Sequence, residues 1–214
     1  MKFKIADIRS DYSKKKLDIG SMEKDPIIQL DHWLEEAIEA DLPEPTAMCL
    51  STVNADGQPS SRMVLLKGIS EGKLFFYTNY HSQKSREIEV NPKCAVSIYW
   101  PQFERQINIL GKVNKADAKT SDAYFESRPW KSQVGAWASP QSEPISSRNV
   151  IMLNFAKYSA RYLGQKVPRP PHWGGFTITP EVFNFWQGRP NRLHDRIKYT
   201  RQSNGNWKLE RIAP

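Results

Sequence analysis

The order of hydrophobic and polar residues predicts a chain of short strands interrupted by a few helices. The first predicted helix covers residues 26–40, where Asp25-Pro26 supplies an N-cap and a proline at the first helical position. Apolar residues recur behind it at helical spacing, at Ile27, Leu30, Leu34 and Ala37. This segment is therefore expected to pack one face on a core.

Runs with β-type composition follow, divided by turn sequences such as Asn54-Ala55-Asp56-Gly57 and Glu71-Gly72. The predicted strands cover residues 47–53, 60–69, 73–79, 93–100, 105–116, 174–179, 181–188, 192–200 and 206–212. Further helices are predicted over residues 82–91, 117–128 and 147–164, the last of them amphipathic. Strands at this close spacing, without regular βαβ alternation, indicate a mainly β fold: a barrel with peripheral α-helices.

Composition and charge place the chain among ordinary globular proteins with an affinity for anions. The 214 residues are 39% hydrophobic and 25% charged, and 31 basic against 23 acidic side chains give a formal charge of +8. Such an excess favours nucleic acid, membrane or phosphorylated metabolites alike. Cys49 and Cys94 form neither a disulfide framework nor a zinc motif. The charged N-terminus and the lack of a long apolar run predict a soluble, cytoplasmic protein.

The segment Arg192-Leu193-His194-Asp195-Arg196 is the first candidate site. In a strand, side chains alternate between faces, so Arg192, His194 and Arg196 would point the same way. Two guanidinium groups flanking an imidazole suit a phosphorylated or electron-rich ring. A solvated basic face explains the same spacing equally well. Trp186 and Gly188, just upstream, add a flat surface and room for close backbone approach.

Other candidate residues for binding an anion lie near helix ends. Tyr124 and Arg128 are four residues apart on a predicted helix, with Ser132 just beyond, and together could hold one phosphate. A surface pair that stabilises the helix is the commoner explanation. Ser82 is either a simple cap or part of an anion site, and Lys84 in the first turn favours an anion nearby.

The run from Arg62 to Lys67 brackets four apolar residues with two cations. In a regular strand these two cations would face opposite ways, so a shared ligand requires a bulge or contacts from the strand end. The remaining histidines show no metal-ligand spacing, and the sequence contains no Gly-rich phosphate loop or nucleophile elbow. We expect no metal site.

Taken together, an ordered set of motifs resembles the pyridoxamine 5′-phosphate oxidase family over roughly residues 9–214. The motifs are RMVLLK, FFYTN, RQINILGKV, YFESRP, SQVGAW, QSEPIS, WGGF, FWQG, RLHDR and the terminal ERIAP. The resemblance implies a split β-barrel homodimer with flavin mononucleotide (FMN) at each subunit interface. It also implies an N-terminal arm over residues 1–25 that closes over the active site, followed by one barrel domain over residues 26–214.

The resemblance assigns roles by matched position. Implied FMN contacts are Arg62, Met63, Val64, Leu65, Leu66, Lys67, Tyr77, Thr78, Gln83, Lys84, Gln106, Gln141, Ser142, Trp186 and Arg196. Implied substrate contacts are Arg9, Tyr12, Lys67, Tyr124, Arg128, Ser132, Arg192 and His194, with Arg192 and His194 nearest the reacting carbon. One position departs from the family: Ser82-Gln83-Lys84 stands where Ser-Arg-Lys is common. We expect weaker FMN binding than in an Arg-bearing variant, because a neutral donor is roughly half as strong as a charged one.

The activity that the resemblance implies is oxidation of pyridoxamine 5′-phosphate and pyridoxine 5′-phosphate by O2 to pyridoxal 5′-phosphate, with release of H2O2 and, from the amine, ammonia. Hydride would pass from C4′ of the substrate to N5 of the flavin. This reaction belongs to vitamin B6 biosynthesis and salvage, and implies no nucleic-acid or membrane partner. Two alternatives remain open at this point: a split-barrel flavin protein with another substrate or none, and a polyanion-binding module that uses the positive charge.

Overall fold

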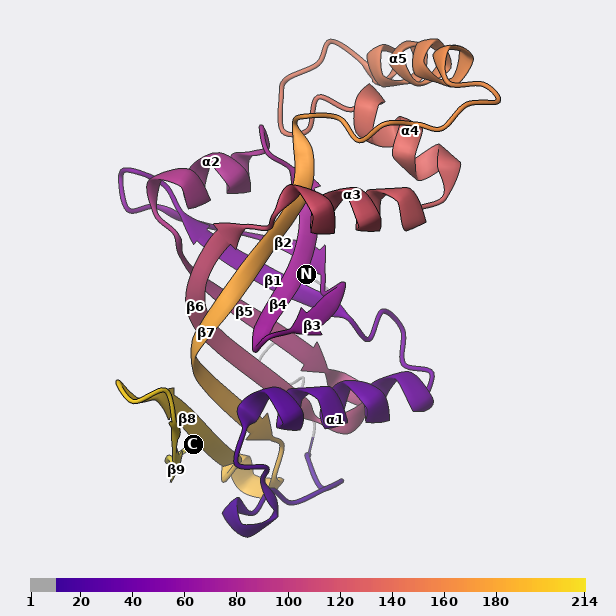
Figure 1. The fold of residues 1–214 in the computed structure, drawn as a ribbon. Coiled ribbons are helices and arrows are strands. Elements are labelled where there is room, and N and C mark those ends of the chain that lie inside the picture. Colours follow the sequence, from indigo (N-terminus) through magenta and orange to yellow (C-terminus); the bar gives the residue numbers. More distant parts are fainter. Residues whose placement is uncertain (1–10) are drawn as a thin grey trace, which may run out of the picture. The chain divides into compact units, whose positions relative to one another are not determined.

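The computed structural model describes residues 11–214, and the chain within it divides into two compact units (Figure 1). Unit 1 contains the residues up to Cys49, Ala95–Leu110 and Pro180–Pro214. Unit 2 contains Leu50–Cys94 and Gly111–Thr179. Four strands pass from one unit to the other, so each unit is built from chain segments that are far apart in sequence. The division into an N-terminal arm and one barrel domain stays a prediction.

Nine strands form one sheet in the described part of the chain, which confirms the mainly β fold class. They are β1 (Ala47–Val53), β2 (Pro59–Leu65), β3 (Gly68–Ser70), β4 (Lys73–Asn79), β5 (Lys93–Trp100), β6 (Arg105–Lys115), β7 (Trp173–Gln187), β8 (Asp195–Arg201) and β9 (Trp207–Arg211). The order is β2-β1-β5-β6-β7-β4-β3, with β8 paired to β7 and β9 to β8. The β8–β9 pairing is antiparallel, and the turn between the two strands contains Gly205 with a positive φ of 86°.

In unit 1, helix α1 (Pro26–Glu39) confirms the first predicted helix. The Asp25 carboxylate accepts a hydrogen bond from the backbone N–H of Ile27 at 2.8 Å, as an N-cap should. The buried face of α1 carries Trp33, whose ring meets Phe185 edge-on at 5.1 Å. The guanidinium of Arg105 lies over the same indole at 4.4 Å. Amphipathic spacing and capping therefore suffice to place this helix on its core.

Unit 2 carries four helices: α2 (Gln83–Val90), α3 (Ala118–Ser127), α4 (Trp130–Ala138) and α5 (Arg148–Arg161). Its hydrophobic cluster gathers Phe125, Val134, Tyr162, Val167 and Trp173. Helix α4 was not predicted, because it has no side-chain N-cap and contains a glycine. The predicted amphipathic pattern of α5 is present but shallow: Ile151, Phe155 and Tyr158 form a half-buried face, and none of the helix residues is fully buried. The segment is helical, but it packs only with half-buried side chains.

The predicted strand over residues 60–69 is divided in the structure. Strand β2 ends at Leu65 and β3 begins at Gly68. Between them the Lys67 N–H donates to the Phe75 carbonyl at 2.8 Å, so the chain is already turning along β4. The break places Lys67 beyond the end of β2, where strand alternation no longer fixes its direction.

Near the C-terminus, two predicted strands are one continuous strand, β7. The prediction placed a break at Pro180, which lacks the N–H that a strand interior needs. In the structure β7 pairs with β4 as far as Ile178 and with β8 from Val182, so Pro180 lies between the two pairings. The missing donor is tolerated at that position.

The prediction that Arg192, His194 and Arg196 share one strand face is wrong. Pro190–Arg192 forms a 3₁₀ turn, and β8 begins only at Asp195. Asn191 and Arg192 both have left-handed backbone conformations, with φ of 57° and 62°. A strand requires negative φ, so the alternation argument does not apply upstream of Asp195.

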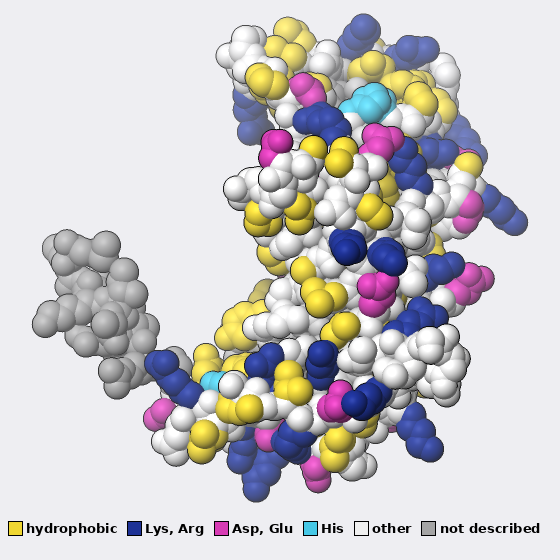
Figure 2. All heavy atoms as spheres, turned by 90° about the vertical axis from the view of Figure 1, so that its left-hand side faces the viewer, with side chains coloured by type: hydrophobic (Ala, Val, Ile, Leu, Met, Phe, Trp, Pro, Cys, Tyr) yellow, Lys and Arg dark blue, Asp and Glu magenta, His cyan; other side chains and the backbone are white. Residues whose placement is uncertain are grey.

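On the face shown in Figure 2, Lys and Arg side chains are interspersed with acidic, hydrophobic and neutral ones. No basic stripe runs along the described residues of this face, as a polyanion track would require. Of the helices in residues 11–214, none is both long and apolar enough to cross a membrane.

Candidate functional site

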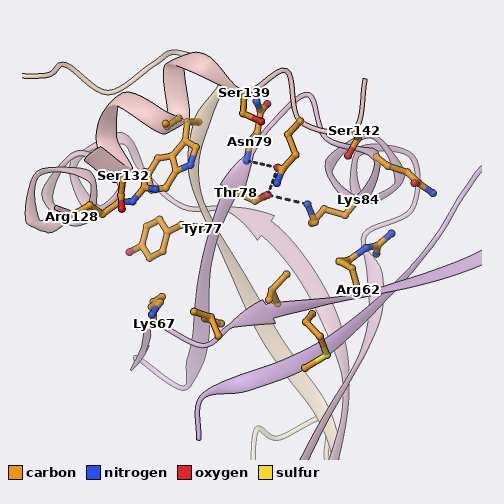
Figure 3. Close-up of a pocket in the computed structure, with 18 of the residues that line it drawn as sticks. Arg62, Lys67, Tyr77, Thr78, Asn79, Lys84, Arg128, Ser132, Ser139 and Ser142 are labelled. Atoms are coloured by element: carbon orange, nitrogen blue, oxygen red, sulfur yellow. Dashed lines mark hydrogen bonds between the residues drawn. The ribbon is translucent and has the colours of Figure 1, made fainter. Parts of the chain in front are cut away.

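Unit 2 contains a cavity of about 770 Å³ whose wall comes from β2, β4, the start of β7, α2, α3, α4 and the segment after α4 (Figure 3). The lining residues are Ser60, Ser61, Arg62, Met63, Val64, Leu65, Lys67, Tyr77, Thr78, Asn79, Gln83, Lys84, Tyr124, Arg128, Ser132, Gly135, Ala136, Ser139, Gln141, Ser142 and Trp173. Arg62 and Lys84 lie toward one side of the view in Figure 3, whereas Arg128 and Ser132 lie toward the other, beyond Tyr77. The cavity thus has two separate cationic ends.

At the first end, Lys84 is a buried cation in the first turn of α2. Its Nζ donates to Thr78 Oγ1 at 3.0 Å and to Ser82 Oγ at 3.2 Å. Burial and the nearby Arg62 guanidinium lower the Lys84 pKa to about 8, although the Glu87 carboxylate acts in the opposite direction. A buried ammonium with no direct carboxylate contact is well suited to receive an anion.

Gln141 closes the same end from the segment after α4. Its Oε1 accepts hydrogen bonds from Thr78 Oγ1 at 3.0 Å and from the Asn79 N–H at 3.4 Å. Ser142 follows in a left-handed conformation, with φ of 70°. These contacts tie the segment after α4 to the end of β4, and so bring residues about 60 positions apart onto one wall.

The second end is centred on Arg128, which follows the last residue of α3. Its guanidinium lies 4.5 Å from the centre of the Trp173 ring, a cation–π distance. Its NH1 atom is buried and has no hydrogen-bond acceptor among residues 11–214. Burial lowers the Arg128 pKa. A buried guanidinium nitrogen without an acceptor destabilises the protein unless a ligand supplies the acceptor. This end of the cavity is therefore also suited to bind an anion.

An aromatic stack separates the two ends of the cavity. The rings of Tyr77 and Tyr124 are parallel within 16°, with centroids 3.8 Å apart, and Trp173 continues the stack at 5.7 Å from Tyr77. Burial raises the pKa of both tyrosines, so both stay neutral at physiological pH. A Cβ at Gly175 would lie only 2.8 Å from Tyr77 Cε1, so glycine is required there for the ring to lie against β7. The wall is flat, apolar and suited to planar rings.

Unit 1 carries a second group of candidate residues around Trp186. The Trp186 ring contacts Tyr12 at 5.6 Å and His194 at 4.7 Å, and Tyr12 meets His194 at 5.7 Å. A Cβ at Gly188 would lie 2.7 Å from Tyr12 Cγ, so this glycine provides the space for Tyr12. The cluster gathers residues about 180 positions apart in sequence.

His194 has a defined tautomer when neutral. The Arg189 N–H donates to His194 Nδ1 at 3.1 Å, which leaves the proton of the neutral ring on Nε2. Burial and the charge of Arg192 lower the His194 pKa, so the neutral form predominates at physiological pH. His194 can therefore donate a hydrogen bond from Nε2.

The N-terminal segment that carries Tyr12 is bound to unit 1 through its backbone. Glu104 Oε2 accepts from the N–H groups of Ser13 and Lys14 at 2.9 and 3.0 Å. Asp195 Oδ2 accepts from the Leu17 N–H at 3.1 Å. Two carboxylates thus hold the segment from which Tyr12 extends.

The structure brings together most of the predicted residues. Of those predicted for the cofactor, the cavity gathers Arg62, Met63, Val64, Leu65, Lys67, Tyr77, Thr78, Gln83, Lys84, Gln141 and Ser142. Of those predicted for the substrate it gathers Lys67, Tyr124, Arg128 and Ser132. Leu66 instead is buried in the core. Gln106, Trp186, Arg192, His194, Arg196 and Tyr12 belong to unit 1, and Arg9 lies outside the described residues. Arg62 and Lys67 share the cavity because Lys67 lies beyond the strand end.

Sequence reasoning missed several lining residues, Ser60, Ser61, Asn79, Gly135, Ala136, Ser139 and Trp173. Trp173 occurs in the motif WGGF, but nothing local indicates that its ring supports a cation. Only the pairing of β7 with β4 and the contact with Arg128 reveal that role.

Comparison with known proteins agrees with this architecture. Residues 34–162 match the family model described as pyridoxamine 5′-phosphate oxidase, and residues 173–214 match the pyridoxine 5′-phosphate oxidase C-terminal dimerisation region. The pyridoxine/pyridoxamine 5′-phosphate oxidase of Chromobacterium violaceum is 51% identical over the full length of both chains. That of Bacteroides thetaiotaomicron is 48% identical over 98% of this chain and 99% of its own.

Solved structures show the same fold. PhzG from Burkholderia lata 383, in complex with tetrahydrophenazine-1-carboxylic acid, superposes with a TM-score of 0.86 at 30% identity, covering 91% of this chain and 95% of its own. A pyridoxamine 5′-phosphate oxidase-related, FMN-binding protein from Nostoc punctiforme has a TM-score of 0.69 at 18% identity, covering 87% and 96%. Fold and cavity define a split-barrel protein whose unit 2 cavity has two cationic ends. The chain belongs to the pyridoxamine 5′-phosphate oxidase family.

Proposed function

We propose that this protein is an FMN-dependent oxidase that converts pyridoxamine 5′-phosphate and pyridoxine 5′-phosphate to pyridoxal 5′-phosphate. O2 is the oxidant, H2O2 is released, and the amine substrate also yields ammonia. The observation that carries the proposal is the cavity of unit 2, in which a flat aromatic wall separates two cationic ends. Such a cavity suits two planar ligands that each carry a phosphate. The full-length similarity to oxidases of this name supports the same activity.

The end at Arg62 and Lys84 fits the phosphate of FMN. A buried ammonium, a guanidinium and the first turn of α2 converge there, and all favour a dianion. Gln83, Thr78, Gln141 and Ser142 supply neutral hydrogen-bonding groups around them, and Met63, Val64, Leu65, Lys67 and Tyr77 line the cavity away from this end. Gln106, Trp186 and Arg196 belong to unit 1, and we keep them as proposed cofactor residues on the basis of the family resemblance alone. When bound, FMN supplies the acceptor for the hydride that leaves the substrate.

The end at Arg128 fits the phosphate of the substrate. Its orphaned NH1 gains an acceptor, and Tyr124, Ser132 and Lys67 line the same cavity. The Trp173 ring supports the guanidinium at 4.5 Å, which favours a preformed clamp. Arg9 and Tyr12 complete the proposed substrate set from the N-terminal arm.

Arg192 and His194 are the proposed residues at the reacting carbon. His194 donates from Nε2 to a substrate oxygen or nitrogen, because its Nδ1 accepts from Arg189. Arg192 contributes positive charge that polarises the substrate. Both hold and orient the substrate, and neither accepts the hydride.

We further propose that the protein acts as a homodimer. The match of residues 173–214 to a region described by its role in dimerisation supports this assembly. Sedimentation at micromolar concentration should give about twice the mass of the 24.7 kDa chain.

The function is tested by an anaerobic titration of the FMN-loaded protein with pyridoxamine 5′-phosphate, followed by air. The flavin absorption should bleach and then recover, with formation of pyridoxal 5′-phosphate and peroxide. A bound flavin that stays oxidised would overturn the oxidase assignment. The PhzG complex shows that this fold also takes a phenazine carboxylate. Bleaching by tetrahydrophenazine-1-carboxylic acid, but not by the phosphorylated vitamers, would favour a PhzG-like specificity.

The pH dependence of FMN binding should report on Lys84. Its pKa is about 8 before a ligand binds, and a dianion nearby raises that pKa, so binding above pH 8 requires uptake of a proton. The dissociation constant should be flat between pH 7 and 8 and then rise by about tenfold per pH unit. Flavin fluorescence quenching gives this constant directly, and the phosphate, with its second pKa near 6, is already dianionic throughout.

A Lys84→Arg variant is the matched control, because its guanidinium stays charged over the whole range. The FMN dissociation constant of this variant should stay constant up to about pH 9.5. A wild-type profile that is equally flat would show that Lys84 does not meet the phosphate.

A further inference from the structure

Glu87 is a buried carboxylate on α2, one turn after Lys84, and the proposed chemistry does not use it. Its side chain is only 7% exposed. Burial by itself would raise its pKa, but hydrogen bonds from Thr52, Ser60, Gln83 and Arg62 outweigh burial and lower the pKa to about 2. Glu87 is therefore a permanent negative charge close to the proposed phosphate site.

The hydrogen bonds of Glu87 connect it to Arg62 by three routes. Arg62 NH2 lies 3.2 Å from Glu87 Oε2. Arg62 NH2 also donates to Ser60 Oγ at 2.5 Å, and Ser60 Oγ donates to Glu87 at 2.7 Å. Thr52 Oγ1 accepts from Arg62 NH1 and donates to Glu87 Oε2. The guanidinium is thus held in one orientation by a carboxylate and two hydroxyl groups.

Gln83 is bound to the same carboxylate. Its Nε2 donates to Glu87 Oε1 at 2.8 Å, one helical turn along α2. The side chain at position 83 is thus neutral and turned toward Glu87. Of the two cations at this end of the cavity, Arg62 is paired with Glu87, whereas the hydrogen bonds that Lys84 makes within residues 11–214 go to hydroxyl groups.

We propose that Glu87 is a positioning residue for the phosphate site: it fixes the Arg62 guanidinium and the Gln83 amide, while Lys84 supplies the uncompensated charge. This inference rests on the proposed function, since it takes the phosphate to be that of FMN. At Arg62 and Gln83, orientation rather than net charge then decides the contribution to FMN affinity. A charge argument alone predicts that removing the Glu87 charge strengthens FMN binding, because a carboxylate near a phosphate repels it.

The orientation explanation and the charge explanation predict opposite effects of Glu87→Gln on FMN affinity. A glutamine has one acceptor oxygen in place of two, and its amide N–H₂ would face the donors of Arg62 or Ser60. The guanidinium would lose its fixed orientation, and we expect FMN to bind roughly tenfold more weakly. Riboflavin, which is FMN without the phosphate, should bind within about twofold of the wild-type value, because its ring does not depend on Arg62.

The experiment measures dissociation constants of FMN and riboflavin by fluorescence quenching for wild type, Glu87→Gln and the control Glu89→Gln. Glu89 is on the same helix but exposed, so its variant should match wild type for both ligands. If Glu87→Gln folds poorly, Ser60→Ala removes one of the three routes and should weaken FMN alone by about threefold.

Loss of FMN affinity with riboflavin unchanged supports the proposal. Equal loss for both ligands would make Glu87 a purely structural residue, and tighter or unchanged FMN binding would show that orientation does not matter. Either result overturns the inference while leaving the proposed function intact. A wild-type protein that binds FMN no better than riboflavin would instead overturn the phosphate site, and the inference with it.

Discussion

Arg128→Met should lower kcat/KM for pyridoxamine 5′-phosphate by about a hundredfold or more. Arg128 carries the buried NH1 without an acceptor, and the substrate phosphate is the proposed partner. Removing one member of a buried charge pair costs roughly 2–5 kcal/mol, which corresponds to this range of rate. The loss should appear as a raised KM in steady-state assays. Unphosphorylated pyridoxamine, which makes no use of the clamp, should be oxidised at the wild-type rate.

Arg128→Met should not lower the free energy of unfolding of the ligand-free protein: we expect this free energy to be unchanged or higher. The wild-type protein holds a guanidinium nitrogen without an acceptor, and Met can pack against the Trp173 ring in its place. Chemical denaturation measures this free energy. Lys131→Met, an exposed substitution in the next helix, is the control and should change neither activity nor stability. An equal loss of activity toward both substrates would show that Arg128 does not recognise the phosphate.

Arg192→Met should reduce kcat by roughly a hundredfold without changing FMN affinity. Arg192 is exposed in a 3₁₀ turn, and its charge acts on the His194 ring beside it. The guanidinium is the proposed source of polarisation at the reacting carbon, so its loss should slow the reductive half-reaction. Stopped-flow bleaching of the flavin measures that step, and fluorescence quenching measures FMN affinity.

Met suits this test because it is unbranched at Cβ and meets the left-handed backbone of residue 192 much as Arg does. Arg201→Met, which removes an exposed arginine from β8, is the matched control and should behave as wild type. Weaker FMN binding with an unchanged rate of flavin reduction would move Arg192 from the substrate set to the cofactor set.

The sequence alone predicted the elements whose pattern is local. The N-cap and proline at Asp25-Pro26 and the apolar spacing behind them define α1. Strand β4 was also predicted with its observed bounds, because a run of β-type composition follows the turn sequence Glu71-Gly72. The motifs shared with the family identified most of the cavity residues in advance, because a motif specifies side chains directly and needs no secondary-structure prediction.

Local patterns failed where a distant partner decides the conformation. Pro180 was read as a strand break, but β7 continues because it exchanges β4 for β8 at that point. The segment from Arg192 to Arg196 reads as an alternating strand, yet Pro190 starts a turn with two left-handed residues. Helix α4 lacks the capping signal that would have revealed it.

The sequence by itself determined the fold class, the family and most of the residues at the two cationic ends. Only the tertiary structure decided how those residues are held. It shows the Arg128 guanidinium packed on the Trp173 ring, the Tyr77–Tyr124 stack, and the hydrogen bonds that connect Glu87 to Arg62. The physical reason is the separation in sequence over which each kind of signal acts. Backbone periodicity reports on neighbours within a few residues, whereas hydrogen bonds and ring contacts join strands and helices whose separation in sequence carries no local signal.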